Sequence, residues 1–438
     1  MAAAPARNSD VESALAEAEA RYVAANSKSR AQYERALKAM PGGNTRSVLF
    51  YSPFPVTIAR GEGCRVWDVD GHEYVDFLGE YTAGLYGHSH PVIMAALRRA
   101  LDGGIVLGGH NAAEAMLAQA VVDRFPSIER VRFTNSGTEA NLMALSTARA
   151  FTGRPKLMAM EGGYHGGVFY FVKPELPINA PFPFVFGRTN DLDYTRDMIR
   201  RHGRELAAVI VEPMMGGTGC LPASREFMTM LREETRACGA VLIFDEVMTS
   251  RLGPSGLQGR LGVLPDMTTL GKYIGGGMTF GAFGGRAEIL DLYDPRRPDA
   301  LPHAGTFNNN TLTMNAGYAG LSQVYTAEAA EALNASGEAL RAGLNALART
   351  RGLPVQLTGI GSMMAVHFRD GAIRTFADVQ AGRQDLKPLL QFDLLARGVY
   401  VGRRGMYVLS LPMGEAERTA LCAAFEEFLD SRANLIAG

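Results

Sequence analysis

Short apolar runs alternate with amphipathic helical segments from about residue 91 to residue 325. Each run is bounded by turn residues, which is typical of strands, and a helical stretch separates it from the next. Runs that are apolar throughout indicate strands buried on both faces, as in parallel sheets built from βαβ units. The pattern predicts an α/β fold with a mostly parallel sheet, whose strands include 131–134, 157–160, 207–211, 241–244 and 267–270.

The pattern changes on both sides of this region. Before it, a helical stripe beginning at Val11 and a second helix over 31–40 precede two short strands at 65–68 and 74–77. After it, helices and strands alternate without the long βαβ spacing, which predicts a smaller α+β unit. Its expected elements are helices 329–349 and 385–397, strands near 361–368 and 407–411, and a last helix that begins near residue 415.

The length of 438 residues agrees with two or three domains of about 150 residues each, or with one large α/β domain that has appendages. We expect N-terminal helices and strands that join the small domain over residues 1–85. We expect a large domain over residues 86–325 and a C-terminal small domain over residues 326–438.

Composition narrows the classes of protein that are compatible with the chain. Apolar residues make up 47%, charged residues 20%, and the net charge is −1, as in ordinary globular proteins without a bulk affinity for nucleic acid. No apolar run is long enough for a membrane span, and the N-terminal residues do not resemble a signal peptide. Four scattered cysteines without a C-x-x-C pair argue against a zinc site and a disulfide framework. We therefore expect a cytoplasmic protein that binds neither membrane nor nucleic acid.

Three ionisable side chains follow the ends of expected strands. Glu212 follows strand 207–211, Asp245 follows strand 241–244, and Lys272 follows strand 267–270. Lys is scarce, with 6 residues against 38 Arg, so a lysine in this position is notable. Ligands of open parallel sheets bind beyond the carboxyl ends of the strands. Either acid alone could be a helix cap, but the three together indicate one site.

Nucleotide-binding motifs do not explain these residues. Asp245 after four apolar residues resembles a Walker B strand, but a P-loop requires G-x-x-x-x-G-K-[ST]. The one Gly-Lys pair, at Lys272, is followed by Tyr273, and Asp266 occupies the place of the first glycine. Two G-x-G segments, at 61–63 and 359–361, lack the third glycine of a dinucleotide fingerprint.

Two other segments are suited to a flat, phosphorylated cofactor. Ser136, Gly137 and Thr138 lie between a strand and an evident helix, where free backbone N–H groups and the helix dipole favour phosphate. A plain helix cap would show the same residues. Downstream, Tyr164 lies among glycines at 161–167, which allow a ring to stack closely on a ligand.

Together these residues supply the groups that pyridoxal 5′-phosphate (PLP) chemistry requires. Lys272 provides the amine that reacts with the cofactor's aldehyde, and Asp245 provides a carboxylate for the pyridine nitrogen. Ser136, Gly137 and Thr138 would hold the phosphate, and Tyr164 would stack on the ring. Lys272, once displaced by a substrate amine, can act as the base that moves the proton.

The chain resembles the class III (fold-type I) PLP-dependent aminotransferases over nearly its whole length. Within that family it is most similar to the glutamate-1-semialdehyde aminomutase-like branch, and in that branch to bacterial β-phenylalanine aminotransferases. The matching stretches are VWDVDG at 66–71, GHSHP at 87–91, FTNSGTEA at 133–140, GYHG at 163–166, FDEVM at 244–248, TLGK at 269–272 and GTF at 305–307.

The resemblance implies features that spacing alone does not indicate. It implies a large domain with a seven-stranded sheet and a homodimer whose active sites lie at the interface. Thr306 would reach the phosphate bound by the neighbouring subunit, Glu212 would hold the network beside the ring, and Val247 would pack on the ring face opposite Tyr164.

Two arginines are expected to set the choice of substrate, because guanidinium groups suit the carboxylates of amino and 2-oxo acids. By resemblance, Arg46 matches the carboxylate binder of β-phenylalanine aminotransferases. Arg404 matches the arginine that binds the acceptor's carboxylate and can swing aside. The aminomutase has the sequence Ser-Pro-Val-Arg after the Asn that both proteins share. In this chain the arginine lies two positions earlier, and Val48 occupies the position of the aminomutase arginine. On the strand expected after Arg46 these two positions would share a face, and we expect Val48, Phe50 and Tyr81 to line the site.

The resulting hypothesis is transamination of an aromatic β-amino acid with 2-oxoglutarate or pyruvate as acceptor. The first alternative is the internal amino transfer of glutamate-1-semialdehyde 2,1-aminomutase, which needs no acceptor. Racemases or decarboxylases of the same fold are a further alternative. A non-catalytic protein that keeps the PLP fold as a binding module is the alternative from another class.

Overall fold

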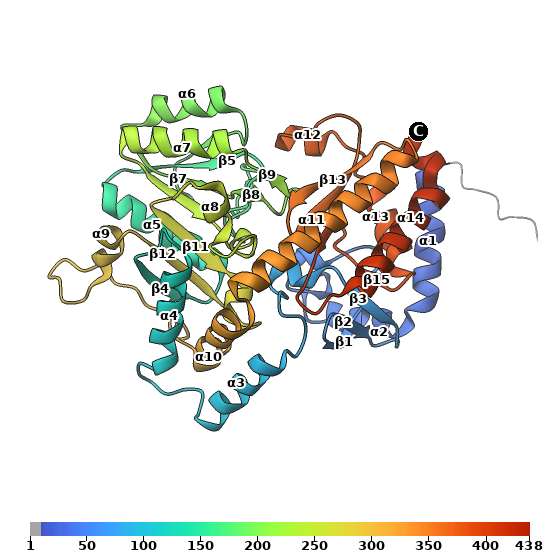
Figure 1. Ribbon diagram of the computed structural model, residues 1–438, viewed down its shortest axis with the longest axis horizontal. Coiled ribbons are helices and arrows are strands. Elements are labelled where there is room, and N and C mark those ends of the chain that lie inside the picture. The colour runs from blue at the N-terminus through green and yellow to red at the C-terminus, as the bar shows by residue number, and fades with distance from the viewer. Residues whose placement is uncertain (1–9) are drawn as a thin grey trace, which may run out of the picture.

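A seven-stranded sheet forms the centre of the larger part of the molecule in the computed structural model, which describes residues 10–438 (Figure 1). Only β12 runs antiparallel to its neighbours β11 and β4, and the other pairings are parallel. The predicted α/β fold with a mostly parallel sheet is confirmed. The strands, in spatial order, are β4 (Arg130–Thr134), β12 (Gly281–Gly285), β11 (Met267–Gly271), β10 (Val241–Asp245), β7 (Leu206–Val211), β5 (Lys156–Met160) and β6 (Phe184–Gly187).

Helices cover both faces of this sheet because its strands are apolar on both faces. In β10, Val241 and Ile243 belong to the same apolar cluster as α5, whereas Leu242 and Phe244 belong to the cluster that contains α7. This alternation follows from the two-residue period of a strand. The helices of this part are α3 (Pro91–Asp102), α4 (Ala112–Arg124), α5 (Gly137–Thr152), α6 (Leu192–His202), α7 (Arg225–Cys238), α8 (Gly256–Leu261), α9 (Ala287–Leu290) and α10 (Thr311–Ala319).

The N-terminal segment packs with the C-terminal part of the chain, far from it in sequence (Figure 1). A four-stranded sheet of order β1-β2-β3-β15 joins them, with β15 parallel to β3. Asp10 caps the first helix by accepting a hydrogen bond from the Ser13 backbone N–H at 2.8 Å. The elements are α1 (Val11–Ala25), α2 (Ser27–Leu37), β1 (Ile58–Glu62), β2 (Arg65–Asp68), β3 (Glu73–Asp76) and β15 (Val399–Tyr400).

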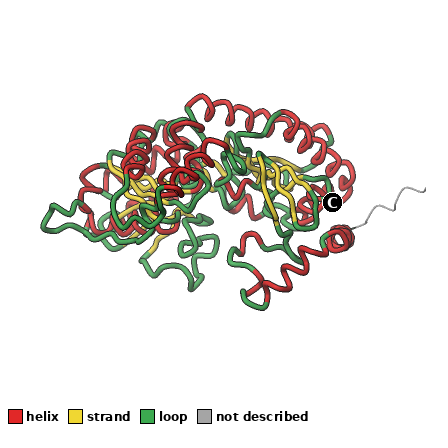
Figure 2. The backbone as a smooth tube through the Cα atoms, turned by 90° about the horizontal axis from the view of Figure 1, so that it is seen from below, coloured by secondary structure: helices red, strands yellow, loops and turns green. Residues whose placement is uncertain are grey.

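The C-terminal part is a three-stranded antiparallel sheet covered by long helices. This sheet lies beside the seven-stranded sheet in the molecule (Figure 2). Its elements are α11 (Ala327–Thr350), β13 (Val355–Ile360), β14 (Met363–Phe368), α12 (Phe376–Gln380), α13 (Leu386–Leu395), β16 (Met406–Val408) and α14 (Glu415–Ala437). A two-stranded ribbon of β8 (Met214–Met215) and β9 (Leu221–Pro222) follows β7 of the large sheet.

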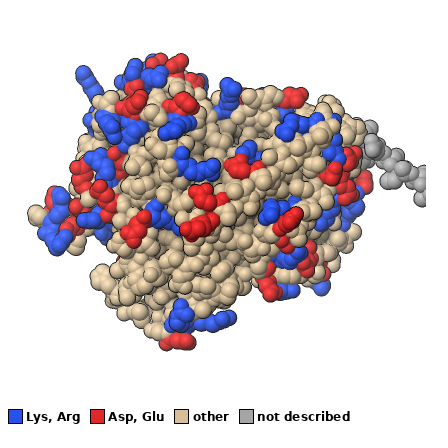
Figure 3. Space-filling model, viewed as in Figure 1, with Lys and Arg blue, Asp and Glu red and all other residues tan. Residues whose placement is uncertain are grey.

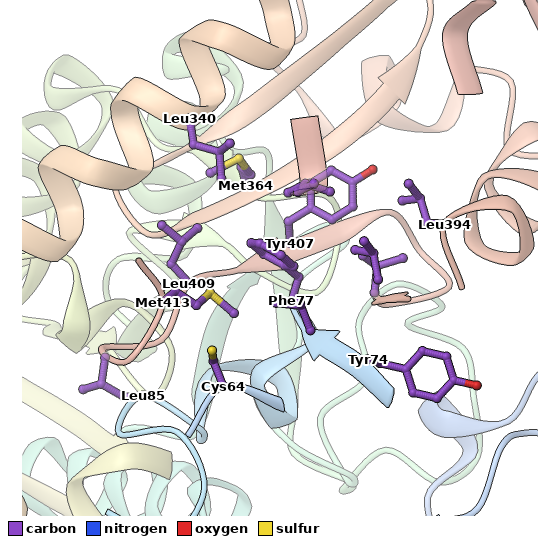
Figure 4. Close-up of a cluster of buried hydrophobic side chains, with 14 of the residues drawn as sticks. Cys64, Tyr74, Phe77, Leu85, Leu340, Met364, Leu394, Tyr407, Leu409 and Met413 are labelled. Atoms are coloured by element: carbon purple, nitrogen blue, oxygen red, sulfur yellow. The ribbon is translucent and has the colours of Figure 1, made fainter. Parts of the chain in front are cut away.

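Apolar side chains from the N-terminal strands and the C-terminal elements share one core (Figure 4). Phe77 and Tyr407 are fully buried there, and Leu340 of α11 packs in the same cluster. Burial of a side chain of this size contributes roughly 1.5–3 kcal/mol. The shared core ties the two ends of the chain into one unit.

Arg251 joins this core to the large sheet. Its guanidinium is fully buried and donates to the Ser362 hydroxyl at 3.2 Å, the Thr82 carbonyl at 3.3 Å and the Leu409 carbonyl. These partners come from the N-terminal segment and from the C-terminal part. The side chain therefore bridges three segments of the chain.

Several expectations from the sequence need correction. The strand expected after Arg46 is a 3₁₀ helix at Ser47–Leu49, so a two-residue shift there does not keep a side chain on the same face. The second helix is α2, four residues earlier than expected at its start. Strands β6, β12 and β13 are present without having been predicted. Within residues 10–438, no helix is long and apolar enough to cross a membrane.

Candidate active site

A cavity of about 380 Å³ lies at the carboxyl ends of β7, β10 and β11. The three ionisable residues predicted from the strand ends, Glu212, Asp245 and Lys272, all line it. So do further residues expected to hold a cofactor or substrate, which are Ser136, Gly137, Thr138, Tyr164, Val247 and Arg46. Elements separated by more than 200 residues thus converge on one site.

Asp245 is buried and held by three hydrogen bonds. It continues the side-chain face of Val241 and Ile243, so it points toward α5. Its Oδ2 accepts from the Asn141 amide at 2.8 Å and lies 2.8 Å from His165 Nδ1, and its Oδ1 accepts from the Val247 N–H at 3.0 Å. A carboxylate has about four acceptor positions, so one is left for a ligand in the cavity.

A second set of contacts fixes the groups that hold Asp245. Thr269 on β11 donates to Asn141 Oδ1 at 2.6 Å, and the Asn141 amide also donates to the His165 carbonyl at 2.9 Å. The Asn141 side chain therefore has one orientation. His165 Nε2 is buried and has no hydrogen-bond partner within the described residues.

Lys272 lies directly after β11, in a backbone conformation that only few non-glycine residues adopt. Its φ is +55°, in the left-handed region. Burial, together with the positive charge of Arg46, lowers the pKa of its amine to about 8, although the negative charges of Asp245 and Glu212 oppose the shift. The lysine can therefore exchange a proton near neutral pH.

Glu212 is a buried carboxyl beside Lys272. Its two oxygens accept from the backbone N–H groups of Tyr164, at 2.9 Å, and Gly216, at 3.0 Å. Burial raises the pKa of Glu212 to about 7, and its neighbour His165 partly offsets this increase. A proton on Glu212 is therefore gained or lost close to neutral pH.

The start of α5 is the place where the sequence predicts a phosphate cradle. Ser136 caps the helix by accepting from the Glu139 N–H at 3.2 Å, and the first N–H groups of a helix lack partners inside it. Thr138 Oγ1 accepts from the Gly167 N–H at 3.1 Å. A side chain at Gly166 would lie 2.3 Å from Thr138 Oγ1, so the glycine permits this close approach.

Arg46 reaches the cavity but is already paired. Its guanidinium forms an ion pair with Glu80, which also lines the cavity. Tyr81 donates from its hydroxyl to the Val48 carbonyl at 3.0 Å. Neither residue, nor Phe50, is among those that line the cavity. Of the three residues expected to line the site, Tyr81 and Val48 instead hold each other beside Arg46, and Phe50 packs on Tyr33.

Arg404 and Thr306 lie outside this cavity in the single chain. Arg404 lines a neighbouring cavity of about 420 Å³, and its Nη1 lies 3.5 Å from the Gly217 carbonyl oxygen. Thr306 is exposed, as is the adjacent Phe307.

Several polar residues at the site were not predicted, and three of them have the clearest roles in holding it together. Asn141 and Thr269 hold Asp245 and its partners, and Glu80 pairs with Arg46. Asn141 carries a detectable signal, because it is polar and lies between apolar residues at 140 and 142–145. Glu80 has none, since it lies 34 residues from its partner.

Comparisons with known proteins identify the family. The solved structures that this fold resembles are fold-type I PLP-dependent transferases, and the family model "Aminotransferase class-III" matches residues 50–414. The chain belongs to the class III aminotransferases, which confirms the resemblance found in the sequence.

The individual relatives cover nearly the whole chain. The beta-phenylalanine transaminase of Variovorax paradoxus is 53% identical over 97% of this chain and 98% of that protein. The crystal structure of a β-phenylalanine aminotransferase from the same organism superposes with a TM-score of 0.95, covering 97% of this chain and 99% of that one, at 53% identity. A glutamate-1-semialdehyde 2,1-aminomutase of Geobacillus kaustophilus is 37% identical over 85% of this chain and 91% of that protein.

Proposed function

We propose that this aminotransferase moves the amino group of an aromatic β-amino acid to a 2-oxo acid, 2-oxoglutarate or pyruvate, with PLP as cofactor. The observation that carries the proposal is the 53% identity to a β-phenylalanine transaminase along 97% of the chain. The aminomutase relative is 37% identical, over a smaller share of the chain. The arrangement of Lys272, Asp245 and the phosphate cradle around one cavity supports the same chemistry.

The residues of the cavity suit each part of PLP. The free acceptor position of Asp245 suits the pyridine N–H, and the start of α5 suits the phosphate. Tyr164 and Val247 line the cavity as an aromatic and a branched aliphatic group and would hold the two ring faces. When bound, PLP supplies an aldehyde for the amine and a ring that accepts electrons from the adjacent carbon.

The residues of the chain provide the proton transfers. Lys272 Nζ would take the proton from the amine-bearing carbon and return it, since its lowered pKa leaves part of the amine neutral near pH 7. Asp245, whose carboxyl is fixed by Asn141 and His165, would hold the pyridine nitrogen of the cofactor and favour its protonated form. Glu212 would fix the Tyr164 backbone beside the ring.

Arg46 and Arg404 would bind carboxylates of the substrates. Arg46 is at the cavity wall and would exchange Glu80 for the carboxylate of the β-amino acid. Arg404 would bind the acceptor's carboxylate. The hydrogen bond from the Tyr81 hydroxyl to the Val48 carbonyl would keep the Arg46 segment in place.

A second copy of the chain would complete the site. Several large apolar side chains are exposed on the segment after α3 and beside Thr306: Ile105, Val106, Leu107 and Phe307. Figure 3 shows few charged side chains over the neighbouring helices α3, α4 and α10. A face of this kind suits a homodimer, in which Thr306 would contact the phosphate of the partner's cofactor.

Product analysis tests the proposal. The PLP-loaded enzyme is incubated with β-phenylalanine and either 2-oxoglutarate or pyruvate, and glutamate or alanine is measured by chromatography. We expect amino acid product in proportion to β-phenylalanine consumed, and none from the Lys272→Ala variant. Conversion of glutamate-1-semialdehyde without any acceptor, together with inert β-phenylalanine, would instead establish the aminomutase reaction.

A further inference from the structure

Tyr273 directly follows Lys272 and connects it to the segment that follows Asp245. The Tyr273 side chain is fully buried, and its hydroxyl donates to the Ser250 carbonyl oxygen at 3.2 Å. Ser250 lies five residues after Asp245, and its N–H donates to the Glu246 carbonyl at 3.0 Å. One side chain therefore joins the two loops that carry the amine and the carboxylate of the site.

The Tyr273 ring is fixed between two other buried tyrosines from distant parts of the chain. The Tyr86 ring, from the N-terminal segment, lies 6.2 Å away between centroids, and the Tyr325 ring, from between α10 and α11, makes an edge contact at 5.4 Å. A ring that is packed on two sides and hydrogen-bonded at its tip has one orientation. Tyr273 therefore fixes the backbone that leads into it.

The backbone of Lys272 requires such support. Its φ of +55° is a conformation that a residue with a side chain keeps only where the surrounding structure imposes it. At the other end of the segment 272–276, a Cβ on Gly276 would lie 2.4 Å from the Ala316 carbonyl oxygen, so this end is packed tightly against α10. The end next to Lys272 is held by Tyr273.

The position of the Lys272 amine decides its charge. Burial and Arg46 lower its pKa to about 8 from the ordinary 10.5, and Asp245 and Glu212 oppose this shift. These are the charged groups that face the amine, and each effect depends on where Nζ lies among them. An amine that can move outward into solvent would regain a pKa closer to 10.5 and would less often be neutral near pH 7.

We propose that Tyr273 is a positioning residue, whose hydrogen bond to Ser250 holds the Lys272 amine in its place beside Asp245. Tyr273 is not among the residues that line the cavity, so it acts through Lys272 and does not touch the cofactor or the substrate. The inference rests on the proposed function, in which Lys272 moves the proton, and adds to it a residue outside the cavity.

Three variants to phenylalanine separate positioning from stability. Tyr273→Phe loses the bond to Ser250. Tyr325→Phe loses a bond of the same kind to the next carbonyl, that of Arg251, which also accepts from the Asn334 amide at 2.9 Å. Tyr86→Phe loses a buried hydroxyl that has no hydrogen-bond partner within residues 10–438. We expect urea to unfold the first two variants at lower concentrations than wild type, and Tyr86→Phe at a concentration no lower than wild type.

The first half of the reaction shows whether Lys272 has moved. Stopped-flow mixing of the PLP-loaded enzyme with β-phenylalanine, without acceptor, gives a limiting rate constant and a Kd from the absorbance change. In Tyr273→Phe the limiting rate constant should fall about three- to tenfold, as for loss of one hydrogen bond, and the Kd should change less than about twofold. Tyr325→Phe and Tyr86→Phe should keep the wild-type rate constant.

Labelling of Lys272 in the PLP-free chain gives a second readout that needs no catalysis. Only a neutral amine reacts with an acylating reagent, and mass spectrometry of the Lys272 peptide measures the extent at each pH. Half-maximal labelling should lie near pH 8 in wild type and in both control variants, and at higher pH in Tyr273→Phe.

The same rate constants in Tyr273→Phe and Tyr325→Phe, or the same labelling profile in Tyr273→Phe and wild type, would overturn the inference. If β-phenylalanine leaves the wild-type absorbance unchanged, the proposed function fails. The labelling profiles then still decide whether Tyr273 positions Lys272.

Discussion

Glu80→Gln should make Arg46 a better carboxylate binder. In the structure the Glu80 carboxylate forms an ion pair with the Arg46 guanidinium, and both residues line the cavity where the β-amino acid is proposed to bind. A substrate carboxylate therefore competes with Glu80 for the guanidinium and is repelled by the negative charge of Glu80. Glutamine keeps the size of the side chain but removes the competing charge.

The expected magnitude follows from the exposure of the pair. The Arg46 and Glu80 side chains are 43% and 52% exposed, and ion pairs exposed to this degree contribute about 0.2–1 kcal/mol. Removing the competitor should lower KM for β-phenylalanine by that amount, which is about 1.4- to 5-fold, with kcat nearly unchanged. Arg46→Ala should instead raise KM by about 10- to 150-fold, because a charge-assisted hydrogen bond is lost.

Steady-state kinetics with varied β-phenylalanine measure both effects. In the Arg46→Ala background, Glu80→Gln should have no further effect, since the double mutant has no guanidinium to release. Glu205→Gln is the matched control, because Glu205 pairs with Lys156 at the opposite ends of the strands. An increase in KM for Glu80→Gln, or the same decrease in the Arg46→Ala background, would refute the reasoning.

Two other predictions concern the phosphate cradle and acid stability. Gly166→Ala should weaken PLP binding at least about tenfold, because the new Cβ would lie 2.3 Å from Thr138 Oγ1 and the residue has a φ of +123°. The Cβ in the control variant Gly167→Ala meets no atom within 4 Å, so this variant should bind PLP normally. Absorbance titrations with PLP measure both affinities. Burial lowers the pKa of His367 to about 4, so unfolding free energy should fall as pH drops from about 6.5 toward 4, by at most about 3 kcal/mol. Urea unfolding at pH 7.5 and pH 5 measures this loss of unfolding free energy, which should be smaller in His367→Asn than in wild type. The control variant His110→Asn, at an exposed position, should lose as much as wild type. An equal loss in all three proteins would contradict the assignment to His367.

The sequence was sufficient to predict that three ionisable residues meet in one cavity, because strand ends can be recognised from apolar runs. Glu212, Asp245 and Lys272 each follow such a run, and parallel strands bring their carboxyl ends to one edge. Strand β12 was not readable, because its sequence GAFGG has few apolar side chains. Its glycines are needed there for another reason: a Cβ on Gly281 would lie 2.1 Å from the Ser136 carbonyl oxygen.

Contacts between distant segments could not be predicted from local pattern. The pairing of Arg46 with Glu80 depends on a 3₁₀ helix that replaces the expected strand. The cations Lys387 and Arg404 come together only through tertiary packing of α13 against the loop before β16. The domain boundaries at 85/86 and 325/326 and the role of Thr306 toward a partner subunit stay predictions.

The absorbance spectrum of the PLP-loaded enzyme during titration with β-phenylalanine, without any acceptor, tests the central claim most directly. We expect the absorbance of the lysine-bound cofactor to disappear with about one equivalent of β-phenylalanine per site and to return on addition of 2-oxoglutarate. Lys272→Ala should lack the initial band. A wild-type band that β-phenylalanine leaves unchanged, or no band after reconstitution with PLP, would contradict the proposed roles of Lys272 and Asp245.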